Sequence, residues 1–176
     1  SLSSRSETSA NCLIKLLEIA KYKIFDVNLR PPHFKIETIV RLMNKSNFIK
    51  FNEEEINLIC LELGCKSKTI KDMISFISSY SKTKNICVSR GSRGAILYTN
   101  NKYYSNKGFK VKTKDTVGSG DSFLAMLISE LKKGVEPVQS LSRACAIGAI
   151  VSTEKGANPK IGMNYLSDFL KKSVIP

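Results

Sequence analysis

The sequence predicts an α/β fold, with a mainly parallel β-sheet covered by helices on both faces as three αβα layers. The first observation behind this prediction is that short apolar runs of strand length alternate with longer amphipathic runs. The second is a glycine turn at 115–122, which joins a strand-like run at 109–114 to an apolar helical run at 123–128. A chain of 176 residues can bury a substantial core, so we expect one domain over residues 1–176.

Helices are expected where apolar residues recur at intervals of three and four, as Leu13, Leu16 and Ala20 do. Gly134 marks the end of one helix, and Pro137 marks the first turn of the next. By these signs the expected helices cover residues 7–21, about 36–43, 53–63, 68–80, 121–133, 137–152 and about 163–172.

Strands are expected at the apolar runs between these helices, and Asn100-Asn101 is typical of a hairpin turn. From Phe109 to Thr113 basic residues alternate with others, as in a strand that has one solvated face. The expected strands cover residues 22–27, 47–50, 86–89, 95–98 and 102–104, with the strand-like segment 109–114 in addition.

Polar residues that directly follow the predicted strands are the first candidates for a site. Parallel α/β sheets bind their ligands at the carboxyl ends of the strands. We therefore expect these residues to meet at one edge of the sheet, although they are far apart in the sequence. They are Asn28 and Arg30, Asn52 and Glu55, Ser89 to Gly91, and Asp115 to Asp121.

The turn Asp115-Thr-Val-Gly-Ser-Gly-Asp121 is suited to bind an anion. The first amides of a helix have no partner within the helix, and the helix dipole adds positive potential there. Gly118 and Gly120 let the backbone approach a ligand closely. A carboxylate at such a place repels phosphate, which indicates that Asp121 is a base beside a transferring phosphoryl group. The alternative is an ordinary helix cap.

Three other segments have a structural and a functional interpretation. Asn52 and Glu55 match a capping box, which we favour because caps are common. The alternative gives Glu55, through water, a Mg²⁺ ion that bridges nucleotide phosphates, with Asn52 helping to place them. Arg30 is either a surface charge or a guanidinium directed at phosphate or an acidic substrate. The small residues Ala144, Ala146, Gly148 and Ala149 favour close helix packing, and could instead offer a flat surface to adenine.

Composition excludes several classes of protein. No apolar run is long enough to span a membrane, and no Walker loop, dinucleotide fingerprint or nucleophile elbow occurs. Five scattered cysteines are typical of reduced thiols in a cytoplasmic protein, and one histidine argues against a transition-metal site. The net charge of +13 could mark a nucleic-acid surface, but the lysines are spread along the chain, so a solvated surface is favoured.

Taken in order and spacing, five motifs resemble the PfkB (ribokinase-like) carbohydrate kinase family over essentially the whole chain. The glycine turn resembles the family signature Asp-Thr-x-Gly-Ala-Gly-Asp, with serine for the usual alanine. The other four motifs are Phe25–Arg30, similar to the Asp-x-Asn-x-Arg segment of fructokinase-like and 2-keto-3-deoxygluconate kinase-like members, Asn52–Glu55 (Asn-x-x-Glu), Ser89–Gly94 (Thr-x-Gly-x-x-Gly, with Ser for Thr) and Lys155–Pro159 (Gly-Ala-x-Pro).

The resemblance implies an ATP-dependent sugar kinase in which Asp121 takes the proton from the sugar hydroxyl. The amides of Val117 to Asp121, including those of Gly118, Ser119 and Gly120, would bind the γ-phosphate, and Asn52 and Glu55 would serve Mg²⁺ and phosphate. Asn28 and Arg30 would favour fructose or a related keto-sugar. The residues that would border the nucleotide are Ser89, Gly91, Gly94, Cys145, Ala146, Ala149 and Gly156.

Two further consequences of the resemblance concern ions and partners. Many family members bind a monovalent cation such as K⁺ through the loop of Asp115, but here Lys160 stands where a serine is common, which argues against that ion. Family members are about twice the commonest domain size and carry an N-terminal Gly-Gly motif, a sugar-binding aspartate and a β-sheet lid. We therefore expect this chain to be the C-terminal portion, inactive alone and completed by the missing half, by a partner chain or in a homodimer. The alternative function is a non-catalytic nucleotide- or nucleic-acid-binding module.

Overall fold

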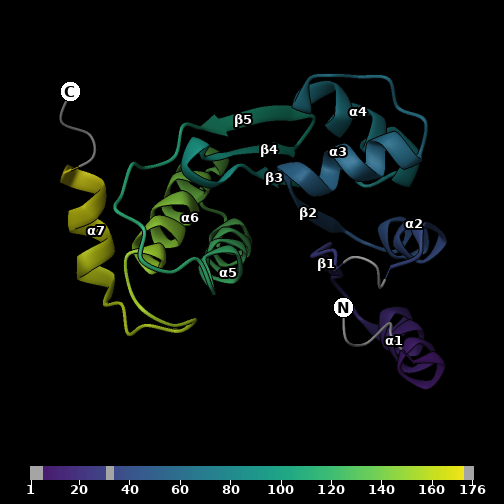
Figure 1. Cartoon of the computed structure of the whole chain (residues 1–176), viewed down its shortest axis with the longest axis horizontal. Helices are drawn as coiled ribbons and strands as arrows, with labels where there is room; N and C mark the ends of the chain where they lie inside the picture. The colour runs from purple at the N-terminus through teal and green to yellow at the C-terminus, as the bar shows by residue number, and fades with distance from the viewer. Residues whose placement is uncertain (1–5, 31–33, 173–176) are drawn as a thin grey trace. The chain divides into compact units, whose positions relative to one another are not determined.

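The computed structural model describes residues 6–30 and 34–172, and its elements follow the predicted order (Figure 1). The elements are α1 (Glu7–Ile19), β1 (Ile24–Asp26), α2 (Ile36–Asn44), β2 (Phe48–Asn52), α3 (Glu53–Glu62), α4 (Ile70–Ser81), β3 (Ile86–Ser89), the 3₁₀ turn η2 (Gly91–Arg93), β4 (Ala95–Thr99), β5 (Lys102–Asn106), α5 (Ser119–Lys132), α6 (Pro137–Ser152) and α7 (Met163–Lys172).

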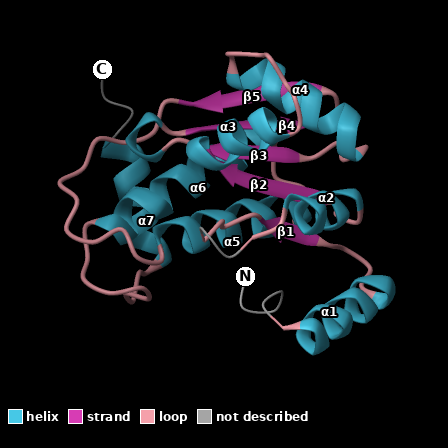
Figure 2. Ribbon diagram, turned by 45° about the vertical axis from the view of Figure 1, so that its right-hand side comes forward, coloured by secondary structure: helices cyan, strands magenta, loops and turns pink. Residues whose placement is uncertain are grey.

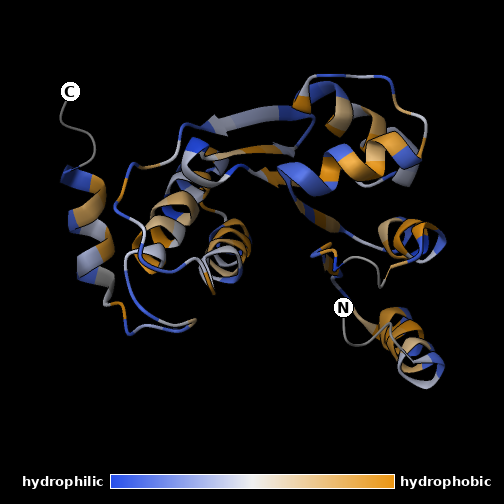
Figure 3. Ribbon diagram, viewed as in Figure 1, coloured by the Kyte–Doolittle hydropathy of each residue, from blue (hydrophilic) through white to orange (hydrophobic). Residues whose placement is uncertain are grey.

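The strands form one sheet in the order β1-β2-β3-β4-β5, and Figure 2 shows the strands and the helices that flank them. β1 and β2 are parallel, with Asp26 in register with Lys50. β4 and β5 form the predicted hairpin, so the sheet is mixed. Asn100 and Asn101 both have positive φ, 52° and 58°, as two-residue hairpin turns require. β4 is apolar and β5 is hydrophilic, which suits a strand at the edge of the sheet (Figure 3).

By its contacts the chain divides into two compact units. Unit 1 comprises residues 1–88 and 98–102, and unit 2 comprises residues 89–97 and 103–176. In unit 1 the core is formed by strand β2 and helices α3 and α4. Phe48, Ile49 and Phe51 of β2 are fully buried, and so are Ile56 of α3 and Ile74 of α4. The expectation of one domain over the whole chain stays a prediction.

In unit 2 helices α5 and α6 pack against each other. Leu127 of α5 and Leu141 of α6 are both buried. A second apolar cluster joins α6 to α7 through Ala146, Ile150 and Leu166. Beside this cluster Phe109 and Phe169 meet edge to face, with ring centroids 5.2 Å apart.

The predicted strand at 109–114 is wrong, because residues 107–113 have no regular secondary structure. The alternation in the sequence is nevertheless real: Phe109, Val111 and Thr113 line a pocket, and the intervening lysines are exposed. No neighbouring strand in the described residues pairs with this backbone. The segment ends where the amides of Lys114 and Asp115 both donate to the Ser152 carbonyl.

Within the described ranges 6–30 and 34–172, none of the helices has both the length and the apolar character that crossing a bilayer requires.

Candidate functional site

The glycine turn forms as predicted and leads directly into α5. Gly118 is the N-cap residue of this helix and has a φ of 79°. A Cβ at Gly118 would lie 2.0 Å from the carbonyl oxygen of Ala157, so only glycine fits beneath the loop that contains Ala157. This close approach, together with the left-handed backbone, explains why the turn needs glycine at this position.

Several amides of the turn are already used within the protein. The Val117 amide donates to Oδ1 of Asp115 at 3.0 Å, and the Ser119 amide donates to the Thr116 carbonyl at 3.2 Å. The amides of Gly118, Gly120 and Asp121 have no hydrogen-bond partner among the described residues. The turn therefore offers an anion fewer free amide donors than predicted, because the prediction also counted the amides of Val117 and Ser119.

Asp115 holds two loops together. Its Oδ1 accepts from Val117, and its Oδ2 accepts from the Gly156 amide at 3.1 Å. These backbone donors, Val117 first and Gly156 second, lower the pKa of the Asp115 carboxyl. Gly156 was predicted to border the nucleotide, and in the structure its amide ties the loop at 155–159 to the glycine turn. A monovalent cation at Asp115 would have to share this carboxylate with amide donors.

Ser119 replaces the usual alanine of the signature and joins α5 to α6. Its hydroxyl donates to the Gly148 carbonyl at 2.8 Å. Gly148 is buried, and a Cβ there would lie 3.3 Å from the Ser119 carbonyl oxygen. The hydroxyl of Ser119 therefore fixes the start of α5 on α6.

Asp121 is the third residue of α5 and lies in its first turn with an exposed side chain. Its own amide and that of Gly120 are two of the three unpartnered donors. The Asp121 carboxylate is open to solvent beside these donors, so it can contact a ligand that the amides bind.

A cavity of about 310 Å³ opens next to the turn, entirely within unit 2. This volume is at the lower end of the range for small-molecule sites. Seven predicted site residues line it, from three separate parts of the sequence. They are Ser89, Gly91, Gly94, Ser119, Gly120, Cys145 and Ala149.

Ala146, Val117 and Gly156 were predicted to contact the nucleotide or its phosphates, and they do not line this cavity. Ala146 is fully buried in the cluster with Ile150 and Leu166, because it lies on the face of α6 that packs against α7. Val117 is 58% exposed and lies on the surface of the turn. Cys145, by contrast, does line the cavity, and burial raises the pKa of its thiol to about 12.

Sequence reasoning missed several residues of the cavity wall. Phe109, Val111 and Thr113 could have been found, because their alternation with lysines is plain in the sequence, where it indicated strand pairing instead. Ser92 and Thr116 lie inside recognised motifs but were given no role of their own, and nothing in the sequence assigned Phe123 or Ser152 to the wall. Gly148, also in the wall, was assigned to the small-residue surface of α6.

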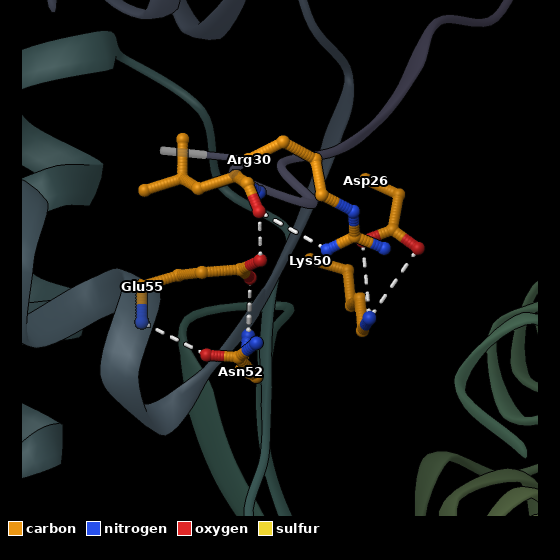
Figure 4. Close-up of polar contacts among 6 residues, drawn as sticks. Asp26, Arg30, Lys50, Asn52 and Glu55 are labelled. Carbon is orange, nitrogen blue, oxygen red and sulfur yellow. Dashed lines mark hydrogen bonds and ion pairs between the residues drawn. The ribbon is translucent and has the colours of Figure 1, made fainter. Parts of the chain in front are cut away.

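Unit 1 carries the second group of predicted residues, drawn in Figure 4. The predicted capping box is confirmed: the Glu55 amide donates to Asn52 Oδ1 at 2.8 Å, and the Asn52 amide donates to Glu55 Oε2 at 2.7 Å. The other carboxylate oxygen, Oε1, accepts from the Leu29 amide at 3.0 Å. Glu55, which is 5% exposed, thus joins the loop after β1 to the start of α3.

The loop after β1 carries Asn28 and Arg30, as predicted. Asn28 has a φ of 42°, and Arg30 donates through Nη1 to the Leu29 carbonyl at 3.1 Å. Sequence reasoning missed a partly buried ion pair between Lys50 and Asp26, whose shortest contact is 3.0 Å. The placement of these residues relative to the glycine turn stays a prediction, because they belong to different units.

Direct coordination of a metal by Glu55 would compete with its two backbone donors. A carboxylate oxygen keeps a second lone pair, so an ion held through water is compatible with this arrangement. The described residues contain no group of three or more His, Cys, Asp or Glu side chains that could hold a metal ion.

The sequence is similar to plant fructokinases. Fructokinase from Solanum tuberosum is 31% identical over 159 residues, which are 84% of this chain and 47% of that protein. Putative fructokinase-8 from Arabidopsis thaliana is 29% identical over 165 residues, 85% of this chain and 75% of that protein. The chain thus spans about half the length of most of these curated relatives.

Solved structures show the same fold. Ribokinase from Thermotoga maritima superposes with a TM-score of 0.75 at 23% identity, covering 90% of this chain and 52% of that one. Fructokinase from Vibrio cholerae, solved with fructose, ADP and calcium, gives a TM-score of 0.78 at 23% identity, covering 99% and 59%. The fold is therefore ribokinase-like. A family model described as the pfkB family carbohydrate kinase matches residues 2–161, and the chain belongs to that family.

Proposed function

We propose that the protein to which this chain belongs transfers the γ-phosphoryl group of ATP to a sugar hydroxyl, with Asp121 as the base. The single observation that carries this proposal is the exposed Asp121 carboxylate beside the unpartnered amides of Gly118, Gly120 and Asp121. Phosphoryl transfer depends on positioning and on charge stabilisation. Amides at a helix start supply both, and a nearby carboxylate can take the proton of the acceptor hydroxyl.

The cavity in unit 2 supports the nucleotide part of the proposal. Its wall combines backbone at Gly91 and Gly94 with apolar surface from Phe109, Val111 and Ala149. A flat apolar ring such as adenine fits walls of this kind. Family membership supports ATP as the phosphoryl donor, and the neighbour from Vibrio cholerae binds ADP.

A keto-sugar such as fructose is the proposed acceptor. The curated relatives carry the name fructokinase, and the Vibrio cholerae neighbour holds fructose. In this chain Arg30 and Asn28 lie on the loop that Glu55 and the β1–β2 pair hold in place. Mg²⁺ is the proposed metal, with Asn52 and Glu55 acting through water. K⁺ at the Asp115 loop and a cytoplasmic location remain secondary parts of this proposal.

The test uses the complete protein, MgATP and a set of sugars that includes fructose, ribose and 2-keto-3-deoxygluconate. Release of ADP should require a sugar. Asp121→Asn should lower kcat by about 10²–10⁴-fold, the range for a general base, while MgATP binding by calorimetry stays equal or tightens. Gly120→Val should lose MgATP binding. Asp168→Asn, an exposed carboxylate on α7, is the matched control and should leave both unchanged.

Two results would overturn the proposal. Sugar phosphorylation that persists at the native rate in Asp121→Asn would remove Asp121 as the base. MgATP binding without phosphorylation of any sugar would instead favour a non-catalytic nucleotide-binding module. A separate assay on the 176 residues alone should show weak nucleotide binding and little phosphorylation, because positioning supplies about 7–11 kcal/mol of such barriers and needs a complete site.

A further inference from the structure

Cys60 and Cys65 are brought together by the end of helix α3, far along that helix from the Asn52 capping box. Leu63 is the C-cap residue, and Gly64, with a φ of 77°, takes the left-handed conformation that follows it. The Cys65 amide donates to the Cys60 carbonyl at 2.8 Å, and the Gly64 amide donates to the Leu61 carbonyl at 3.0 Å. These two bonds define a Schellman motif.

A Schellman motif places two particular side chains in contact, those three residues before and two residues after the C-cap. In most helices both are apolar. In this chain both are cysteines, and the Cys60 thiol, which donates to the Met73 carbonyl at 4.0 Å, lies close enough to Cys65 for the two side chains to interact. The backbone thus holds two sulfur atoms together across a turn of six residues, 60–65.

We propose that Cys60 and Cys65 are a reversible oxidation site, at which a hydroperoxide converts the two thiols into an intramolecular disulfide. The unequal exposure of the two thiols sets the order of events. Cys65 is partly exposed, whereas Cys60 is 1% exposed among apolar side chains. Burial, and then the neighbouring Cys65, raises the pKa of Cys60 to about 12, so Cys60 is not the thiol that reacts first.

The chemistry requires one molecule of hydroperoxide. The Cys65 thiolate attacks a peroxide oxygen, the O–O bond breaks, and the departing oxygen leaves as water or an alcohol after it takes up a proton. Cys65 is then a sulfenic acid. The Cys60 sulfur attacks the Cys65 sulfur, the S–O bond breaks, and hydroxide leaves with the Cys60 proton as water. The two sulfurs together lose two electrons, and the peroxide gains them.

The simplest alternative is that the two thiols serve only as a small apolar contact, a common role of cysteine. The two possibilities differ in how folding affects the disulfide. If the native turn presents the sulfurs to each other, the disulfide forms more favourably in the folded chain than in the unfolded chain. The disulfide then stabilises the folded state by the same factor.

The experiment treats the complete folded protein with stepwise hydrogen peroxide, blocks free thiols with iodoacetamide and digests with trypsin. Residues 51–66 form one tryptic peptide that contains Cys60, Cys65 and no other cysteine. We expect this peptide to lose the mass of two hydrogen atoms and to escape alkylation, and dithiothreitol should reverse both changes. Cys12→Ser, at an exposed cysteine on α1, is the matched control and should behave like the native protein.

Variants and a redox titration make the test decisive. Cys60→Ser should trap Cys65 as a sulfenic acid that dimedone labels, and Cys65→Ser should leave Cys60 unmodified. In a glutathione buffer the folded protein should form the disulfide with an equilibrium constant at least tenfold above that in urea, a shift of about 30 mV. Equal constants in both states, alkylation of both cysteines after peroxide, or a disulfide from Cys65 to another cysteine would each overturn the proposal.

Discussion

The Lys50 ammonium lies 3.0 Å from Oδ1 and 3.3 Å from Oδ2 of Asp26, its register partner on the neighbouring parallel strand. Lys50 is 7% exposed. The pair is partly buried, with the Asp26 side chain 21% exposed, so Lys50→Met, which removes these charge-assisted hydrogen bonds, should lower the free energy of unfolding by about 1.5–3 kcal/mol. Urea denaturation measures this loss. Lys68→Met, at an exposed lysine, should change the stability little, and equal effects of the two substitutions would contradict the prediction.

Glu55 should stabilise the folded state even when no metal is bound. Glu55→Gln keeps one oxygen acceptor and replaces the other oxygen with a donor, so the Leu29 or the Asn52 amide loses its partner. An unsatisfied buried donor costs about 1–3 kcal/mol. We expect the free energy of unfolding to fall by that amount in the absence of any nucleotide or Mg²⁺. The neighbouring Glu54→Gln, at an exposed residue, is the control. A Glu55→Gln variant as stable as the native protein would show that the hydrogen bonds from the Leu29 and Asn52 amides do not stabilise the fold.

Gly118→Ala should damage the turn far more than another glycine substitution with the same backbone angle. Gly134 has a φ of 78°, and a Cβ added there would have nothing within 4 Å, whereas at Gly118 the Cβ meets the Ala157 carbonyl. Gly134→Ala should therefore cost only the left-handed backbone, about 1–2 kcal/mol. Gly118→Ala should cost more and should weaken MgATP binding. Calorimetry and urea denaturation of both variants provide the comparison, and equal losses would refute the steric explanation.

Stability should fall in acid partly through Glu130. Arg143 of α6, through its hydrogen bond, and then Lys133 lower the pKa of this buried carboxyl. A carboxyl with a lowered pKa stabilises the folded state above its unfolded pKa, and this contribution is lost as the pH falls through the folded value. Urea titrations from neutral to acidic pH should show a steeper loss for the native protein than for Arg143→Met. Parallel curves would exclude this contribution.

The sequence predicted the order of helices and strands well, because apolar periodicity reports local structure. The Asn100-Asn101 hairpin and the Gly134 helix end were recognised from residues whose backbone angles are distinctive. The segment 109–114 was misassigned because alternation shows only that two sides of an extended chain differ. It does not show whether a neighbouring strand is present to pair with the backbone.

The sequence predicted the glycine turn of the candidate site well, but it predicted the residues of the cavity wall less well. Asn52 and Glu55 were found from a capping pattern, but no local signal revealed that Glu55 also accepts from Leu29, because that bond joins residues 26 positions apart. Ala146 was assigned to the nucleotide together with Cys145 and Ala149. A helix turns by about 100° per residue, so adjacent positions face different partners, and the sequence did not say which face α7 would cover.

Each of the two compact units consists of two separate segments of the chain. The chain passes from one unit to the other after Val88, after Leu97 and after Lys102. Neither unit is a continuous stretch, so no single cleavage can release one intact. Strand β4 and strand β5 each contribute residues to both. We therefore expect the units to unfold together in one transition rather than in separate steps, so a ligand bound to unit 2 would also raise the melting temperature of unit 1.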